Sequence, residues 1–473
     1  MIEKLYLFIS NLNGFIWGPP MITLIFALGI YLTIKLKFPQ KYLFKGIKLS
    51  IRADKGKGEV SSFGSLAVIV AATVGTGSII GVSTALSEGG PGAIFWMIVA
   101  GIFCFTIKYA ECLLAIKYRK HLKSGEYVGG PMYVIRDVLK QKKVAVIFAV
   151  STLAMSLTAG SALQSNSIAD ALRDGYNINP WYAAIFVTIM TALVILGGIK
   201  RIVSFSEWLV PIMGGLYLFA ALIIGCMNYE KIPGMISAIF TQAFTGKAAL
   251  GGAMGVSIIG LVKAMVSAIT PGMTRAVLAT ESGLGSAPIM AAAAQTNSPV
   301  RQAVVSSTSV FWTIIICTIS GVVFYLAGDL ENTSLYGFPL CNSAFKTIPF
   351  IGTPILVFSL VMFSFTTIIG WCYYGEKVLQ FLEGDSWIKP FRFVFLIVIF
   401  AGTVLGANFD WGFFMTAENA AHFSGGNTTR FMWALVIFCM SFMTVINIYS
   451  IIRLRNDIAG ETFKHIEKDV INK

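Results

Sequence analysis

The chain has 473 residues, of which 56% are hydrophobic and only 12% are charged. Soluble domains carry about twice that share of charged residues, so the composition excludes an ordinary soluble protein. We expect the net charge of +13 to mark cytoplasmic loops between membrane spans rather than a nucleic-acid interface. Neither the three histidines nor the seven cysteines have the spacing of a metal site or a disulfide framework.

Apolar runs predict an all-α polytopic membrane protein with about eleven transmembrane helices. Lysines and arginines gather after the first, third, fifth and eleventh runs. The positive-inside rule therefore predicts a multi-pass protein of the cell membrane, with its N-terminus outside and its C-terminus cytoplasmic. The first run lacks a cleavage site, so we expect it to be retained as a span. The runs lie at 17–36, 61–88, 92–118, 144–170, 180–198, 206–227, 250–285, 301–327, 351–381, 391–408 and 430–453.

Two glycines flank a threonine in the middle of the second run, at Gly75-Thr76-Gly77. Glycine weakens a helix, and unwound backbone at membrane depth is tolerated only when protein buries it or when it lines a cavity. We therefore predict a broken helix. Its free amides at Thr76, Gly77 and Ser78 would receive a carboxylate, and carbonyls near Val74 would receive a cation. The alternative is close helix packing through small residues.

A second break is predicted in the seventh run, at Pro271-Gly272, because proline removes a helix hydrogen bond. Met273 beside it is a substrate-binding candidate, and Pro271 and Gly272 are gating candidates. Lys263 lies in the same run without an acidic neighbour at helical spacing. It is compatible with vestibule lining, with a distant carboxylate partner, or with a fixed charge that replaces a coupling ion.

Three further polar positions lie inside apolar runs. The adjacent hydroxyls of Thr366 and Thr367 suit a hard cation, either sodium or a proton, although a threonine often bonds its own helix. The amide of Gln164 both donates and accepts, which suits a zwitterion, and a helix–helix hydrogen bond is its alternative. Lys108 and Glu111 are three residues apart, and we expect them to pair as structural charges.

The two predicted breaks are five spans apart, which predicts two inverted five-helix repeats. Residues 1–60 would form an extra helix and a basic loop, 61–227 the first repeat, 250–453 the second repeat, and 454–473 a cytoplasmic tail. A secondary transporter with a site at the meeting point of the breaks is the function that this pattern favours. We expect the lipid bilayer as its surroundings, no nucleic acid, no obligate protein partner and no organic cofactor.

The chain resembles the alanine/glycine:cation symporter family, also called sodium:alanine symporters, through many strings in order. These strings are Asn13–Pro20, Ala72–Gly77, Gly89–Met97, Lys108–Glu111, Gly129–Tyr133, Gln164–Ser167, Gly197–Lys200, Gly283–Pro288, and Gly370-Trp371 with Tyr373–Lys377. The resemblance implies a leucine-transporter-type fold and sodium-driven import of a small neutral amino acid such as alanine or glycine. Proton coupling or exchange of an altered substrate, and an amino-acid sensor on the same scaffold, are the alternatives.

By position, the resemblance implies specific roles. Thr76, Gly77 and Ser78 would bind the substrate carboxylate. Gln164, Thr366 and Trp371 would complete the amino-acid pocket. The sodium site would combine carbonyls of Ala71 and Val74 with the hydroxyls of Thr366 and Thr367. The family usually has asparagine where Ser78 stands and tryptophan where Pro271 stands, and these departures imply a rebuilt pocket wall.

Overall fold

The computed structural model describes residues 12, 16–17, 19–52, 54, 56–245, 258–330, 337–408 and 427–471. Within these ranges, the side chains of residues 19, 245, 258–267, 405–408 and 427–434 are outside the description. Lys263 is therefore described only as part of a helical backbone, and the roles predicted for its side chain stay predictions.

The first part of the chain forms helices of very unequal length. They are α2 (Pro19–Lys35), η1 (Pro39–Tyr42), α3 (Leu43–Ile51), α4 (Ser62–Thr73), η2 (Thr76–Ser78), α5 (Ile80–Gly89), α6 (Gly92–Lys117), α7 (Pro131–Tyr133), η3 (Val134–Val138), α8 (Lys142–Leu157), η4 (Thr158–Ala162), α9 (Leu163–Tyr176), α10 (Pro180–Ile195), α11 (Gly198–Met227), η5 (Tyr229–Lys231) and α12 (Ile232–Thr245). Between α6 and α7, strands β1 (Lys120–His121) and β2 (Tyr127–Val128) form a small antiparallel hairpin.

The second part of the chain begins with a long helix that contains a proline. Its elements are α13 (Ile258–Thr280), α14 (Ala287–Ala291), α15 (Pro299–Ala327), α16 (Phe338–Phe345), α17 (Gly352–Glu383), η7 (Asp385–Trp387), α18 (Ile388–Asn408), α20 (Asn427–Arg453), α21 (Arg455–Ile466) and η9 (Glu467–Ile471).

Each predicted apolar run overlaps at least one of these helices. Among the described residues, seven helices are long and apolar enough to cross a membrane, or up to nine if each of two bent helix pairs is one span. The chain is therefore a multi-pass helical membrane protein, and the count of eleven stays a prediction.

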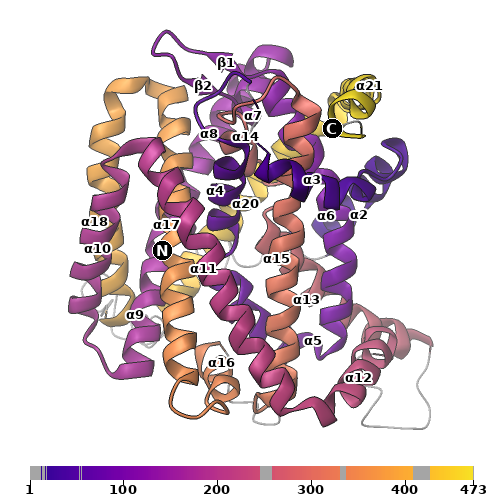
Figure 1. The fold of residues 1–473 in the computed structure, drawn as a ribbon, viewed down its shortest axis with the longest axis vertical. Helices are drawn as coiled ribbons and strands as arrows, with labels where there is room; N and C mark the ends of the chain where they lie inside the picture. Colours follow the sequence, from indigo (N-terminus) through magenta and orange to yellow (C-terminus); the bar gives the residue numbers. More distant parts are fainter. Residues whose placement is uncertain are drawn as a thin grey trace.

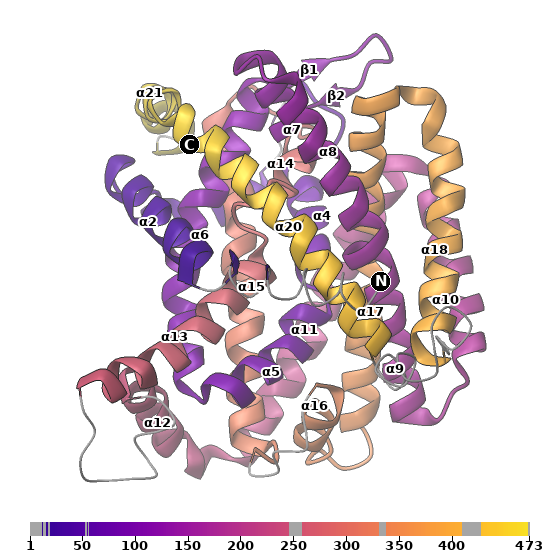
Figure 2. The ribbon, with the colours of Figure 1, turned by 180° about the vertical axis from the view of Figure 1, so that it is seen from behind.

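Helix α17 lies in the middle of the bundle (Figure 1), and most of its apolar length is buried. It packs against α4, α8, α9 and α11, while α10 and α18 pair at one side of the molecule. On the other side α6 packs against α13 and α15. Helix α20 crosses the back of the bundle over α8 (Figure 2). Every element of the candidate site thus touches α17 or α6.

Backbone contacts close the bundle at the end that carries the β1–β2 hairpin, which we call the hairpin end. Residues 57–60 pair with 293–296: Thr296 N donates to Lys57 O, and Gln295 N donates to Val60 O over 2.7 Å. Gly58 has φ +151°, and a Cβ there would lie 2.3 Å from a carbonyl oxygen. Only glycine permits this close approach of two backbones.

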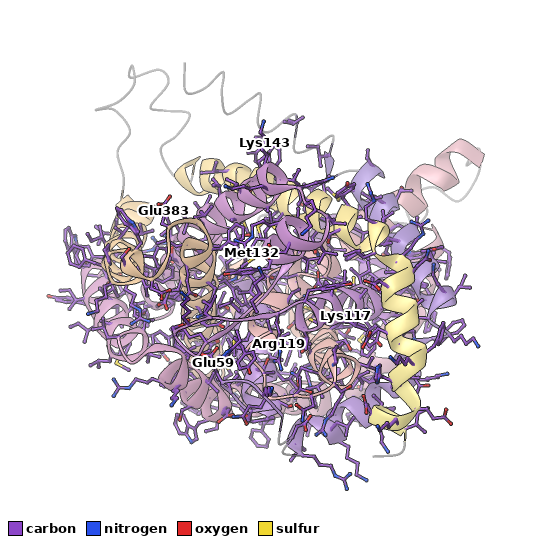
Figure 3. The ribbon with its side chains drawn as sticks, turned by 90° about the horizontal axis from the view of Figure 1, so that it is seen from above. Glu59, Lys117, Arg119, Met132, Lys143 and Glu383 are labelled. Carbon is purple, nitrogen blue, oxygen red and sulfur yellow. The ribbon has the colours of Figure 1, made fainter. Side chains whose placement is uncertain are left out.

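Arg119, at the hairpin end (Figure 3), ties the two segments together with its guanidinium. It donates hydrogen bonds to four backbone carbonyls, those of Ala292, Ala294, Lys57 and Thr296, over 2.7 to 3.0 Å. The planar five-donor fork of arginine suits such a set of acceptors. One side chain therefore holds the strand-like segments before α4 and after α14 to the end of α6.

Candidate functional site

The predicted break in the second apolar run is confirmed. Helix α4 ends at Thr73, the short turn η2 follows, and α5 leaves at 68° to α4. A Cβ at Gly75 would lie 2.7 Å from the hydroxyl of Thr367 and 3.1 Å from Gln164 Oε1. Glycine at this position is what lets those two side chains approach the break.

Gln164 reaches the break from the start of α9, directly after the π-helical turn η4. Its Oε1 accepts from the hydroxyl of Thr76 over 3.2 Å and from the Thr76 amide over 3.4 Å. The amide of Ser78 donates to Gly75 O over 3.0 Å, while the Ser78 hydroxyl is buried without a partner among the described residues. A carboxylate that takes the amides of Thr76 and Ser78 therefore has to replace these two bonds.

The two adjacent threonines on α17 face different partners. The Thr367 hydroxyl lies 3.0 Å from Ala71 O on α4 and 3.0 Å from Phe363 O in its own helix, so it links the two helices. Thr366 bonds Phe363 O in its own helix and lies 3.7 Å from the Met213 sulfur on α11. The structure thus joins Thr367 to the end of α4, near Val74, and turns Thr366 toward α11.

Trp371 is buried one turn further along α17. A Cβ at Gly160 in η4 would lie 2.3 Å from the Trp371 Cβ, so the π-helical turn fits closely around this residue. The indole N–H donates to Glu281 Oε1 over 3.2 Å. Ser286 donates to Glu281 Oε2 over 2.6 Å. Trp371 is therefore fixed from both sides, by η4 and by the turn between α13 and α14.

The second break was predicted at the wrong place. Helix α13 runs unbroken through Pro271 to Thr280, and the chain turns at 281–286 before α14. A proline in a membrane helix is tolerated where neighbouring helices compensate. Here Gly272 packs so closely on the start of α6 that a Cβ would lie 2.4 Å from Ala93 O, and Pro271 lies beside Gly89. Met273 is buried in the core.

The turn at 281–286 is held by buried charges. The predicted pair of Lys108 and Glu111 is confirmed at 3.0 Å, with both side chains buried. Lys108 also donates to Glu281 O over 2.9 Å. Asn447 on α20 donates to Glu111 and to Gly283 O, over 2.7 and 2.9 Å. The pair therefore joins α6, the turn and α20, as expected of structural charges.

The model of the sodium:alanine symporter family matches residues 2–419. The chain belongs to the sodium:alanine symporter family. At the level of the family it is a transporter, not an enzyme. Members of this family transport amino acids, and the family name gives sodium as the coupling ion.

Several curated relatives of this symporter-family chain cover most of its length. An uncharacterized transporter of Haemophilus influenzae is 43% identical over 409 residues, which are 85% of this chain and 88% of the relative. The sodium/alanine symporter AgcS of Methanococcus maripaludis is 39% identical over 424 residues, 87% and 91% of the two chains. The probable sodium/glutamine symporter GlnT of Bacillus subtilis is 30% identical over 400 residues, 83% and 80% of the two chains.

Solved structures share the fold of this family member at low identity. A manganese transporter of Eremococcus coleocola matches with a TM-score of 0.54 at 12% identity, over 83% of this chain and 80% of that chain. A sodium-coupled sialic acid symporter matches with a TM-score of 0.51 at 15% identity, over 92% and 98%. The chain therefore shares its fold with these two transporters.

Sequence reasoning missed Arg275, which lies one turn after Pro271 on α13. Its guanidinium donates to Gly77 O in the break of the other helix. A Cβ at Gly81 would lie 1.8 Å from this guanidinium. Its Nε is buried without a partner among the described residues. The available signal was a charged residue inside an apolar run.

Proposed function

We propose that this chain is a secondary-active importer of a small neutral amino acid, alanine or glycine in kind, coupled to sodium by alternating access. The observation that carries the proposal is the break at Gly75–Gly77, onto which Gln164 from α9 and Thr367 from α17 converge. Broken helices with free backbone groups at the midplane are the common site of secondary transporters. Relatives named for sodium/alanine and sodium/glutamine symport support the substrate class.

In this proposal the substrate carboxylate binds the amides of Thr76, Gly77 and Ser78 at the start of α5. Gln164 exchanges its bonds to Thr76 for bonds to the substrate, and Trp371 forms a wall of the pocket with Thr366. A hydroxyl and an amide within reach of one break can hold both charged ends of a zwitterion. Met273 is proposed to contact the substrate, and Pro271 and Gly272 are proposed to act in gating.

The sodium ion is proposed to bind between the end of α4 and α17. Carbonyl oxygens of Ala71 and Val74 and the hydroxyls of Thr367 and Thr366 would supply an all-oxygen shell, which suits a hard cation. The hydrogen bond between Thr367 and Ala71 O brings two of these ligands together. Thr366 has to turn from α11 to join them. A proton at this position is the alternative.

Alternating access needs two gates that open in turn. The backbone pairing and the four bonds of Arg119 at the hairpin end are proposed as the closed cytoplasmic gate, because basic loops mark that side. The N-terminus would then be outside. Residues 61–227 and 250–453 are proposed as the inverted repeats, with 1–60 and 454–473 outside them. Because α13 is unbroken at Pro271, the turn at 281–286 is proposed as the counterpart of the first break.

Uptake by purified protein in liposomes tests the proposal. We expect an inward sodium gradient, with choline as the replacement ion, to drive accumulation of labelled alanine or glycine. Uptake that depends on a proton gradient and does not depend on sodium would show that the coupling ion is a proton and not sodium. Binding measured by thermal stabilisation, without counterflow in the same liposomes, would overturn transport in favour of a sensor.

A further inference from the structure

An apolar groove lies between helices α6 and α15. It has a volume of about 510 Å³ and is lined by 98–105 of α6, 310–319 of α15, and Gln40 and Leu43 above them. Both helices are long enough to cross a membrane. Ile98 and Ile102 are 40% and 50% exposed, so the groove opens sideways. The nine helical steps from Val310 to Ile319 of α15 give it a length of about 14 Å.

The roof of the groove is a short helix that turns away from the spans. The pair η1–α3 is bent by 71° from α2. Gly46 packs on Thr308 and Val304 of α15, and Leu49 is buried. In contrast, Phe44 and Ile51 are both 76% exposed. A helix that buries one face on protein and exposes apolar side chains beside lysines is typical of the membrane interface.

The same roof carries concentrated positive charge. Between Lys35 and Arg52 the sequence has lysines at 37, 41, 45 and 48 and no acidic residue. Lys41 directly follows Gln40, and Lys41 and Lys48 are exposed. Juxtamembrane lysines attract anionic lipid headgroups. The mouth of the groove is therefore suited to an anionic headgroup, and its interior to an acyl chain.

At the top of the groove, the side-chain amide of Gln40 has hydrogen-bond partners for its nitrogen but not for its oxygen among the described residues. Its Nε2 lies 2.7 to 3.0 Å from Thr33 Oγ1, Thr106 Oγ1 and Ile102 O, and its two hydrogens are shared among these three acceptors. Its Oε1 is buried and has no hydrogen-bond partner among the described residues. A buried acceptor without a donor is costly, so a small turn of the Gln40 side chain that opens this oxygen to a ligand hydroxyl is favoured.

We propose that this groove binds one anionic phospholipid with a hydroxyl-bearing headgroup, of the phosphatidylglycerol type. One acyl chain lies between α6 and α15, the phosphate lies near Lys41 and Lys48, and a headgroup hydroxyl donates to Gln40 Oε1. The lipid holds the interfacial helix α3 against α15.

Delipidated full-length protein, titrated with detergent-solubilised dioleoyl lipids, tests the site by native mass spectrometry and thermal shift. We expect one phosphatidylglycerol to bind at least tenfold more tightly than phosphatidylcholine or phosphatidylethanolamine. Lys41→Gln with Lys48→Gln should remove this preference, whereas the matched pair Lys142→Gln with Lys143→Gln should keep it. Preference that survives in the first pair, or no preference in the wild type, would overturn the proposal.

The groove and the glutamine are tested separately. Ile102→Trp fills the groove and should abolish tight binding, while Ile185→Trp on α10, with a similar exposed fraction of 49%, should not. Tight binding by Ile102→Trp protein would overturn the acyl-chain placement. If Ile102→Trp protein does not fold, the comparison between the two double lysine variants tests the site instead. Equal affinity for phosphatidylmethanol, which has the charge without the hydroxyls, would overturn the contact to Gln40.

Discussion

Trp371 on α17 donates its indole N–H to Oε1 of Glu281 over 3.2 Å, and Glu281 stands in the turn that follows α13. Ser286 occupies the other carboxylate oxygen, and Lys108 holds the Glu281 carbonyl. The position of the indole therefore depends on the turn between α13 and α14. Any movement of that turn is passed to the wall of the proposed substrate pocket.

This contact predicts energetic coupling between the two residues. Glu281→Leu and Trp371→Phe should each raise the substrate concentration for half-maximal uptake at least fivefold. Because both remove the same hydrogen bond, the double variant should fall short of additivity by about 1 kcal/mol. Glu281→Gln keeps an acceptor and should restore most of the affinity. Additive effects would contradict the coupling.

Gly81 leaves space for the Arg275 guanidinium in the first break. Gly81→Ala would place a Cβ 1.8 Å from that group, so Arg275 has to leave its bond to Gly77 O. We expect uptake to fall at least tenfold while the protein stays folded. Gly225→Ala on α11, where nothing lies within 4 Å of an added Cβ, is the control. Equal uptake by both variants would rule out the importance of this contact.

Thr367 joins the proposed sodium site to α4, so Thr367→Val should weaken sodium dependence. We expect the sodium concentration for half-maximal uptake to rise at least fivefold. Thr280→Val is the matched control, because the Thr280 hydroxyl is also buried but bonds Ala276 O in its own helix. Thr366→Val should have the smaller effect of the two α17 variants. A larger shift in Thr280→Val than in Thr367→Val would argue against the cation placement.

Arg119→Gln should loosen the hairpin end, because it removes most of the four bonds to backbone carbonyls. Hydrogen exchange of the amides of Gln295 and Thr296 should then become at least tenfold faster. Arg201 donates to a single carbonyl, that of Leu193, and Arg201→Gln serves as the control. Unchanged protection in Arg119→Gln would mean that the backbone pairing closes this end without the arginine.

Glu126 at the hairpin end predicts a pH effect on stability. Burial alone would raise its pKa, but hydrogen bonds from Lys377 and Gln380 outweigh this, and the pKa lies below its ordinary value of 4.5. The stabilisation is therefore complete above pH 4.5 and is lost as the pH falls through the folded-state pKa. Because the carboxylate is one third exposed, it amounts to less than about 1 kcal/mol.

Thermal unfolding between pH 7 and pH 3.5 measures this contribution. Glu126→Gln should lower the melting temperature at pH 7 and should lose less stability than the wild type on acidification. Glu383→Gln removes an exposed carboxylate from the same end of α17 and should leave the pH profile unchanged. A wild-type profile in Glu126→Gln protein would refute the assignment.

The local sequence correctly predicted the break at Gly75–Gly77, but the break that it predicted at Pro271-Gly272 is wrong. Around Gly75 the glycines themselves disfavour a helix, so the break does not depend on contacts with other helices. Pro271-Gly272 has the same local weakness, but Gly272 lets α13 pack on Ala93, and the helix continues. The real turn relies on Lys108 and Asn447, which come from distant helices. Its local signal was Gly283 and Gly285, which have φ of +85° and +82°.

Some features of the site residues could likewise be predicted from the local sequence, whereas others depend on how the helices pack. Thr366 and Thr367 look equivalent in sequence, but neighbours on a helix point about 100° apart, and in this structure the Thr367 hydroxyl bonds α4 while Thr366 lies against α11. Gln164 could be placed because an amide in an apolar run needs a partner. Its partner, Thr76, follows from packing of α9 that no local pattern encodes.

The fit of the Arg275 guanidinium against Gly81 also constrains how the two positions can change over evolutionary time. A side chain larger than hydrogen at 81 is compatible with this packing only where residue 275 is shorter than arginine. Among members of the family, the two positions should therefore covary, although they are almost two hundred residues apart. Arginine at 275 should accompany glycine at 81, and lineages that lost the arginine should be those in which alanine or serine entered the helix.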